Sequence, residues 1–296
     1  MRFTLNALSV EIPADHIDQA RSFYSQRTPG RGPSNLSELR AVRVQRSNPP
    51  PSDPPAVVEN IGVPVRIFAP ADVPARGVYL DIHGGGFYMD SAARHDTRNR
   101  KRADALGAVV VSVDYRLAPE HPWPAAPDDC EVAARWLLEN MERRFGTSRL
   151  AIGGASAGAT LAMVTALRLR EHEFVGAALE FGTYDLSAHT PAGRRIADEY
   201  FLDAYAGHAK DRTHPDISPV YADLRGLPPV LMVVGSDDIV LEDNLAMAGR
   251  LSAAGNDVEL RIYPESPHGF TGHATEIAAA AVSDIESWLR DRFTIR

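Results

Sequence analysis

Short apolar runs alternate with longer stretches of helical periodicity along most of this chain. The apolar runs are Val63 to Phe68, Gly77 to Ile82, Ala108 to Asp114, Leu150 to Gly153, Ala177 to Phe181, Val230 to Val234 and Val258 to Tyr263. Several are apolar nearly throughout, which is typical of strands buried in a parallel sheet. The helical stretches are Ala126 to Arg144, Ala157 to Arg170, Glu242 to Ala254 and Thr275 to Arg290. The alternation predicts an α/β protein with a mainly parallel central sheet flanked by helices.

Two segments interrupt this pattern. Residues 47–55 are rich in proline and cannot form a helix or a central strand, because proline lacks the amide proton and disfavours a helical residue before it. The residues before this linker carry apolar side chains at roughly helical spacing, which predicts a small helical appendage. Residues 184–227 combine histidine, proline, glycine and charged residues without a clear strand. We expect them to form an insertion between two core strands.

Composition and charge narrow the class of protein. The 296 residues are 44% apolar and 24% charged, which is typical of a globular chain, and we expect one domain over residues 1–296. The formal net charge is -8, and the arginines are mixed with acidic residues. A nucleic-acid partner is therefore not expected, because phosphate binding requires clustered Lys and Arg.

Cysteine usage and hydropathy indicate the compartment. Cys130 is the single cysteine, so no intrachain disulfide is expected, and its position predicts a buried helix residue. The segment from Met1 to Leu8 lacks the apolar core of a signal peptide. No later stretch is long and apolar enough for a membrane span. These features favour a cytoplasmic protein.

A candidate nucleophile lies where a strand runs directly into a helix. The sequence there is Gly154-Ala155-Ser156-Ala157-Gly158. A serine at such a sharp turn is held in a strained conformation with its hydroxyl exposed, and only small neighbours allow the turn. The alternative is a loop that binds phosphate or merely turns. No Lys follows the glycines and Gly-x-Gly-x-x-Gly is absent, so nucleotide binding has little support.

A glycine run upstream is a candidate for binding a negative oxygen. His83-Gly84-Gly85-Gly86-Phe87 follows the predicted strand Gly77 to Ile82. Glycines leave backbone amides uncovered, and such amides stabilise the oxyanion of a tetrahedral intermediate. A plain flexible turn explains the run equally well on its own. Its place before the serine turn favours an oxyanion loop, with the Ala157 amide as a further donor. We expect His83 itself to be structural.

The acid of a catalytic triad is sought between the serine and the histidine along the chain. Asp237 follows the strand Val230 to Val234, where a carboxylate emerges at the edge of the sheet. Asp238 is its rival. Asp243 begins a predicted helix, where an acidic residue commonly just favours the helix dipole. The sequence therefore favours Asp237 and leaves Asp238 open.

The candidate base is His268, in the loop between the last predicted strand and the final helix. A serine nucleophile needs such a base, and the base needs a carboxylate to fix its tautomer. His273 lies at the start of the helical segment, where we expect a surface or cap residue. The other histidines show no metal-ligand spacing such as His-Glu-x-x-His.

These residues together resemble the hormone-sensitive-lipase-like branch of the α/β-hydrolase esterases. The resemblance covers about Val63 to Trp288. It is carried by the serine turn and by His83-Gly84-Gly85-Gly86-Phe87, Asp114-Tyr115-Arg116-Leu117-Ala118-Pro119-Glu120-His121-Pro122-Trp123-Pro124-Ala125-Ala126 and Ser266-Pro267-His268-Gly269-Phe270. The long second motif is the most specific, since generic α/β patterning does not require it. The resemblance implies that it packs under the oxyanion loop.

The resemblance also implies roles for individual residues. Gly85, Gly86 and Ala157 would donate to the oxyanion, and Asp237 would be the acid. Residues 1–50 and 184–227 would form a helical cap over the pocket. The sequence departs from many relatives in two places. Ala155 replaces an Asp before the nucleophile, and Asp238 replaces a Pro after the acid.

The expected function is that of a serine carboxylesterase acting through an acyl-enzyme. The resemblance implies short- to medium-chain esters as small-molecule substrates, and a homodimer as one assembly. The substrate pocket is expected to include Phe87, Tyr88 and Phe270. No metal or organic cofactor is needed for this chemistry. The alternatives are an N- or O-deacetylase of small metabolites with the same triad, and a non-catalytic ligand-binding protein of the same fold.

Overall fold

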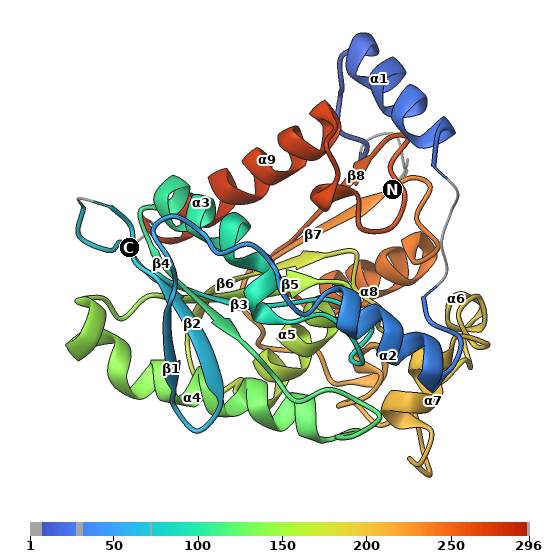
Figure 1. Cartoon of the computed structure of the whole chain (residues 1–296), viewed down its shortest axis with the longest axis horizontal. Helices are drawn as coiled ribbons and strands as arrows, with labels where there is room; N and C mark the ends of the chain where they lie inside the picture. Colours follow the sequence, from blue (N-terminus) through green and yellow to red (C-terminus); the bar gives the residue numbers. More distant parts are fainter. Residues whose placement is uncertain (1–7, 28–31, 72, 295–296) are drawn as a thin grey trace.

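An eight-stranded sheet runs through the molecule in the computed structural model (Figure 1), which describes residues 8–27, 32–71 and 73–294. The strand order is β1-β2-β4-β3-β5-β6-β7-β8. The strands are β1 (Val57–Asn60), β2 (Pro64–Phe68), β3 (Val78–Ile82), β4 (Val109–Val113), β5 (Leu150–Ala155), β6 (Phe174–Glu180), β7 (Val230–Gly235) and β8 (Val258–Tyr263). Strand β2 is antiparallel to both of its neighbours, and the strands from β4 to β8 along the sheet are parallel. The expected mainly parallel sheet is therefore confirmed.

The central strands follow the apolar runs of the sequence. Every residue of β3, β4 and β7 is buried, as expected for strands covered by helices on both faces. Strand β1 was not predicted, because it is an edge strand with a weak apolar pattern. Its Val57 and Val58 are 57% and 61% exposed.

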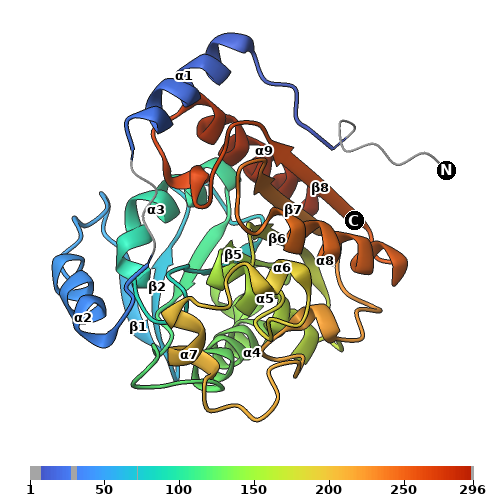
Figure 2. The ribbon, with the colours of Figure 1, turned by 90° about the vertical axis from the view of Figure 1, so that its right-hand side faces the viewer.

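Five long helices cover the two faces of the sheet (Figures 1 and 2). They are α3 (Asp96–Leu106), α4 (Ala125–Phe145), α5 (Ala157–Arg168), α8 (Leu241–Ala253) and α9 (Glu276–Arg292). Buried residues of α3 and α9 belong to one apolar cluster, and those of α4, α5 and α8 belong to the other. Helix α3 was not predicted, because its sequence is mostly polar and its buried face includes Asn99 and Arg102. The other four confirm the predicted helices.

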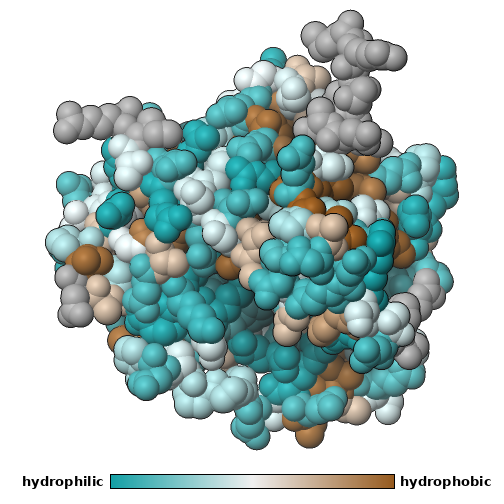
Figure 3. All heavy atoms as spheres, turned by 90° about the horizontal axis from the view of Figure 1, so that it is seen from above, coloured by the Kyte–Doolittle hydropathy of each residue, from teal (hydrophilic) through white to brown (hydrophobic). Residues whose placement is uncertain are grey.

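The segment before the proline-rich linker forms two helices, α1 (Ala14–Ser25) and α2 (Leu36–Gln45). Helix α1 packs beside α9 (Figure 2) through the buried Ala20. Just before it, Val10 N donates to Ile262 O of β8 at 3.0 Å. The face seen over α1 and α9 is mostly hydrophilic, with smaller hydrophobic areas (Figure 3). Residues 1–7 and 28–31 of the expected cap lie outside the described residues.

The insertion and the remaining loops contain only short elements. Helices α6 (Pro191–Arg194) and α7 (Tyr200–Ala206) lie within residues 184–227. Among the described residues there are also the 3-10 turns η2 (Ala92–His95), η3 (Pro219–Tyr221) and η4 (Phe270–Gly272). Residues 47–55 form neither helix nor strand, as predicted. None of the helices in the described ranges combines the length and the apolar character that crossing a membrane requires.

Candidate active site

Ser156 occupies the sharp turn between β5 and α5. Its φ of 54° and ψ of -122° lie in a region that non-glycine residues seldom adopt. The turn is tied to the sheet by Ser156 N, which donates to Glu180 O at 2.8 Å. Such conformations are retained where the surrounding structure enforces them, commonly at functional sites. The strand-turn-helix context predicted for this serine is confirmed.

Two glycines of the motif make room for the turn. A Cβ atom on Gly158 would lie 1.9 Å from Ile82 O, and a Cβ on Gly154 would lie 2.2 Å from the same oxygen. Both distances are far below van der Waals contact, so a side chain at either position would displace the backbone of β3. The sequence pattern around Ser156 is therefore a steric requirement of the turn.

His268 contacts the Ser156 hydroxyl from the loop that follows β8. The distance from Ser156 Oγ to His268 Nε2 is 2.9 Å. The Phe181 ring contacts the imidazole edge-on, with 5.1 Å between the ring centroids. His273, by contrast, lies farther along the loop and contacts the Tyr24 hydroxyl at 3.1 Å. The structure therefore brings the predicted nucleophile and base together.

Asp238, and not Asp237, lies against the other nitrogen of the imidazole. The two carboxylate oxygens of Asp238 are 3.0 and 3.1 Å from His268 Nδ1. Asp238 is 5% exposed, whereas the Asp237 side chain is exposed and accepts from Ser236 Oγ at 2.9 Å. The expectation of Asp237 as the orienting carboxylate is wrong.

A tight turn after β7 explains the exchange of the two aspartates. Asp238 N donates to Gly235 O at 3.3 Å, so Ser236 and Asp237 are the central residues of the turn. Central turn residues point outward, and Asp238 is the first residue that returns to the sheet edge. The Asp238 carboxylate is fixed there by Val240 N, which donates to Oδ1 at 3.0 Å.

The glycine run after β3 presents backbone amides near the serine. Gly85 and Gly86 have φ values of 106° and 59°, and a Cβ on Gly85 would lie 2.1 Å from Met89 O. Within the described ranges, the amide nitrogens of Gly85, Gly86 and Ala157 donate no hydrogen bond to the protein. Backbone amides without a partner in the protein are the donors that an oxyanion requires. Gly86, Ala157 and Ser156 line one cavity.

The motif from Asp114 to Ala126 supports this loop from below. Tyr115 Oη donates to His83 O at 2.9 Å, and the two rings stack with 4.2 Å between their centroids. Ala118 N donates to Phe87 O at 3.0 Å. His83 is buried, and burial, with a smaller contribution from His95, lowers its pKa. The motif therefore packs against the glycine loop, and His83 is buried between them, as the structural roles expected for both require.

The cavity over Ser156 has a volume of about 640 Å³. Most of its wall is apolar or aromatic, from α1, the glycine loop, the insertion and the loop after β7: Tyr24, Phe87, Tyr88, Met89, Ile196, Phe201, Ile239 and Val240. Phe87 and Tyr88 line it as expected. Phe270 does not, because its side chain points away from the cavity and packs against Tyr263 and Phe181 in the core. The expectation of Phe270 in the pocket is wrong.

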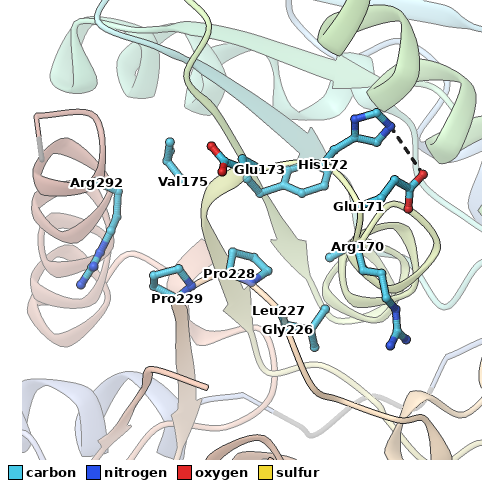
Figure 4. Close-up of a pocket in the computed structure, with 12 residues that line it drawn as sticks. Arg170, Glu171, His172, Glu173, Val175, Gly226, Leu227, Pro228, Pro229 and Arg292 are labelled. Atoms are coloured by element: carbon cyan, nitrogen blue, oxygen red, sulfur yellow. Dashed lines mark ion pairs between the residues drawn. The ribbon is translucent and has the colours of Figure 1, made fainter. Parts of the chain in front are cut away.

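A second hollow of about 570 Å³ lies at the amino ends of β6 and β7 (Figure 4). Charged side chains lie around it, including Arg170, Glu171 and Arg292, and His172 Nε2 lies 3.5 Å from the Glu171 carboxylate. Among its described lining residues there is no serine, threonine or cysteine. In the part of the chain that the structure describes, no group of three or more His, Cys, Asp or Glu residues is arranged to bind a metal ion.

Comparison with known proteins agrees with this geometry. Residues 79–272 match the family described as the alpha/beta hydrolase fold. Carboxylesterase NlhH of Mycobacterium tuberculosis is 35% identical over an alignment of 237 positions that covers 74% of each chain. Ethyl acetate hydrolase of Pseudomonas putida is 34% identical over an alignment of 226 positions that covers 70% of this chain and 71% of the relative. The crystal structure of a hormone-sensitive lipase from a metagenome library has a TM-score of 0.80 and 30% identity, covering 96% of this chain and 100% of that one. This chain belongs to the α/β-hydrolase family, and its structural neighbours include the hormone-sensitive-lipase-like esterases.

Proposed function

We propose that this chain is a serine carboxylesterase that hydrolyses small esters with short to medium acyl chains. One observation carries the proposal: Ser156 Oγ lies 2.9 Å from His268 Nε2, and the opposite nitrogen of that ring lies 3.0 Å from Asp238. Acyl transfer needs a nucleophile, a base that contacts it, and a carboxylate that contacts the base. Ser156, His268 and Asp238 are arranged in this way.

In the acylation step His268 takes the proton from Ser156 as the serine oxygen attacks the ester carbonyl. The carbonyl oxygen becomes negative, and the amides of Gly85, Gly86 and Ala157 stabilise it. The intermediate collapses when the bond to the alkoxy oxygen breaks. His268 then protonates this oxygen, and the alcohol leaves the acyl-enzyme.

Deacylation repeats the same chemistry with water. His268 removes a proton from the water as it attacks the acyl carbon, and it returns the proton to Ser156 Oγ when the acid leaves. Asp238 accepts from His268 Nδ1 throughout. It therefore directs Nε2 toward the serine and stabilises the positive imidazolium that forms in both steps.

The pocket supports the substrate class. Its volume of about 640 Å³ and its mainly apolar wall suit a small ester with an apolar acyl group. The names carboxylesterase and ethyl acetate hydrolase, carried by relatives, support the same class. We assign residues 1–50 and 184–227 as a cap on a single α/β-hydrolase domain, because Tyr24, Ile196 and Phe201 reach the pocket from these segments.

Labelling with a fluorophosphonate followed by peptide mass spectrometry tests the nucleophile. The label is expected on Ser156 and absent from Ser156→Ala. A series of nitrophenyl esters of increasing acyl length then tests the pocket, with kcat/KM highest for short to medium chains. A protein that takes no label and hydrolyses no ester contradicts the proposal. Turnover of acetamides at rates near those of acetate esters would instead indicate a deacetylase.

Two expectations remain predictions. A homodimer is tested by light scattering of the purified protein, and a cytoplasmic location by fractionation of the producing cells.

A further inference from the structure

A cluster of buried charged side chains lies between α3 and strands β3 and β6 of the sheet. Glu180 is the last residue of β6, and its carboxylate contacts Arg98 and Arg102 of α3. Arg102 Nη1 also lies 3.7 Å from Asp81 of β3. The side chains of Arg102, Glu180 and Asp81 are 0%, 1% and 5% exposed. The proposed acyl transfer uses none of these groups directly.

The charge on Glu180 is maintained inside the protein. Burial by itself raises the pKa of Glu180, but the guanidinium groups of Arg98 and Arg102 and the hydrogen bond from Thr271 together outweigh burial, and the net pKa is lowered. A buried ion pair is often no more stabilising than apolar side chains of the same shape. Stability alone therefore gives little reason for a buried charge at this position, and its contacts must be considered instead.

Glu180 is joined to both parts of the candidate active site. Its main-chain oxygen accepts from Ser156 N at 2.8 Å. Its carboxylate Oε2 accepts from Thr271 Oγ1 at 2.6 Å. Thr271 lies three residues after His268 and is 7% exposed. One residue of β6 thus connects the backbone of the nucleophile with the loop of the base.

We propose that Glu180 is a positioning residue that, through Thr271, keeps the His268 loop at hydrogen-bonding distance from Ser156. The proposal rests on the serine-hydrolase function proposed above. A displacement of a catalytic group by about 1 Å can lower the rate on the order of 10²-fold. The His268 side chain is itself 37% exposed, and a buried anchor in its loop limits such displacement. Arg98 and Arg102 keep the anchoring carboxylate charged and fixed in place.

Thr271→Val tests the anchor with the smallest change in shape. We expect kcat on a short-chain nitrophenyl ester to fall roughly tenfold while KM stays within about twofold, because the substrate pocket is not altered. Thr271→Ser keeps the hydroxyl and is expected to retain most of the activity. Thr165→Val is the matched control, since Thr165 is also buried and donates to Leu161 O at 2.8 Å within α5. Its kcat is expected to remain within about twofold of the original.

Glu180→Gln is the second variant. It keeps the size of the side chain but leaves two guanidinium groups without their carboxylate, so circular dichroism first establishes that it folds. We expect kcat to fall at least as far as in Thr271→Val. In the variant that combines Glu180→Gln and Thr271→Val, kcat is expected to be little lower than in Glu180→Gln alone, because both substitutions remove the same Glu180–Thr271 contact. If Glu180→Gln does not fold, Thr271→Val decides the question alone.

The outcomes separate this proposal from the proposed function. If Thr271→Val has a lower melting temperature but keeps kcat within about twofold, the Thr271–Glu180 hydrogen bond contributes to stability only, and the positioning role is overturned. A loss of kcat in Thr165→Val as large as in Thr271→Val overturns it equally. The rate of fluorophosphonate labelling is measured in parallel. Equal rates for Thr271→Val and the original protein refute the positioning role alone, whereas an original protein that neither labels nor turns over refutes both proposals.

Discussion

The hollow at the carboxyl ends of the strands has a volume of about 640 Å³, and the one at the amino ends of β6 and β7 has about 570 Å³. The two differ little in size. At the carboxyl ends, Ser156 has a strained backbone and its hydroxyl contacts His268. At the amino ends, His172 Nε2 lies 3.5 Å from the Glu171 carboxylate (Figure 4). Volume therefore does not distinguish the two hollows. They differ in which side chains contact one another, because, among the residues that the structure describes, a serine hydroxyl contacts a histidine in one of them only.

Backbone geometry separates the two ends as well. The carboxyl end contains Ser156, Gly85 and Gly86 at positive φ, and free amides beside them. At the amino end Gly226 has a φ of 73°, but a Cβ there would meet nothing within 4 Å. The positive φ of Gly226 therefore only allows a surface turn. At the carboxyl end, residues with positive φ form the turns that surround the Ser156 cavity.

The largest effect is expected from Ser156→Ala. Removing the nucleophile should lower kcat on a short-chain nitrophenyl ester on the order of 10⁴- to 10⁶-fold, because the Ser156 hydroxyl is the group that contacts the base, His268. The melting temperature should change little, or rise, since alanine does not leave a buried polar group unpaired. Steady-state kinetics and thermal melting measure both quantities. Retained turnover would mean that the chemistry occurs elsewhere, and the contrast between the two ends would be lost.

The second largest effect on kcat is expected at Asp238 and not at its neighbour Asp237. Asp238→Asn should lower kcat roughly 10³- to 10⁴-fold, because an amide no longer holds the required histidine tautomer or stabilises the imidazolium. Asp237→Asn is the matched control and should remain within about threefold, since that side chain lines the cavity but accepts from Ser236, and Asp238 is the carboxylate that contacts His268. The same ester assay measures both. A larger loss in Asp237→Asn than in Asp238→Asn would contradict the geometry of the site.

A smaller effect concerns stability near the carboxyl end. The Asp243 carboxylate is buried and accepts from Tyr184 N and Asp185 N at 2.5 and 3.1 Å. Burial raises its pKa from 3.8 to about 6. The folded protein therefore binds a proton more tightly than the unfolded chain does, and stability decreases as the pH rises from about 4 to about 6. A shift of this size corresponds to roughly 3 kcal/mol of unfolding free energy.

Asp243→Asn should remove this pH dependence, because the amide does not ionise. At pH 8 the variant should melt several degrees higher than the original protein, and at pH 4 the two should nearly coincide. Thermal melting from pH 4 to pH 8 measures the difference. Asp237→Asn provides the control, as its exposed carboxylate should not change the dependence. If the melting temperatures of Asp243→Asn and of the original protein change with pH in the same way, ionisation of Asp243 does not cause the loss of stability.

The smallest effect is expected at the amino end. His172→Ala removes one member of the ion pair in Figure 4, and its side chain is 38% exposed. Exposed pairs contribute little to stability, and the site is remote from Ser156. We expect kcat/KM within about twofold and a melting temperature within about two degrees. A large loss of activity would show that the second hollow takes part in the reaction and would remove the contrast.

The periodicity of the sequence predicted seven of the strands and four of the long helices. Those elements are buried on regular faces, so their apolar residues recur with the period of the element. Strand β1 and helix α3 escaped this reasoning for different reasons. Val57 and Val58 face solvent on an edge strand, and α3 buries Asn99 and Arg102. Hydropathy carries no signal for a face whose buried residues are polar and satisfied by distant partners.

The sequence by itself determined the strand-turn-helix context of Ser156, the glycine loop and the histidine loop, because each depends on neighbours along the chain. Only the tertiary structure decided between Asp237 and Asp238, since a turn of the backbone exposes one and returns the other to His268. It also placed Phe270 in the core. Such choices depend on where residues far apart in sequence meet, and the identity of a residue does not state the direction of its side chain.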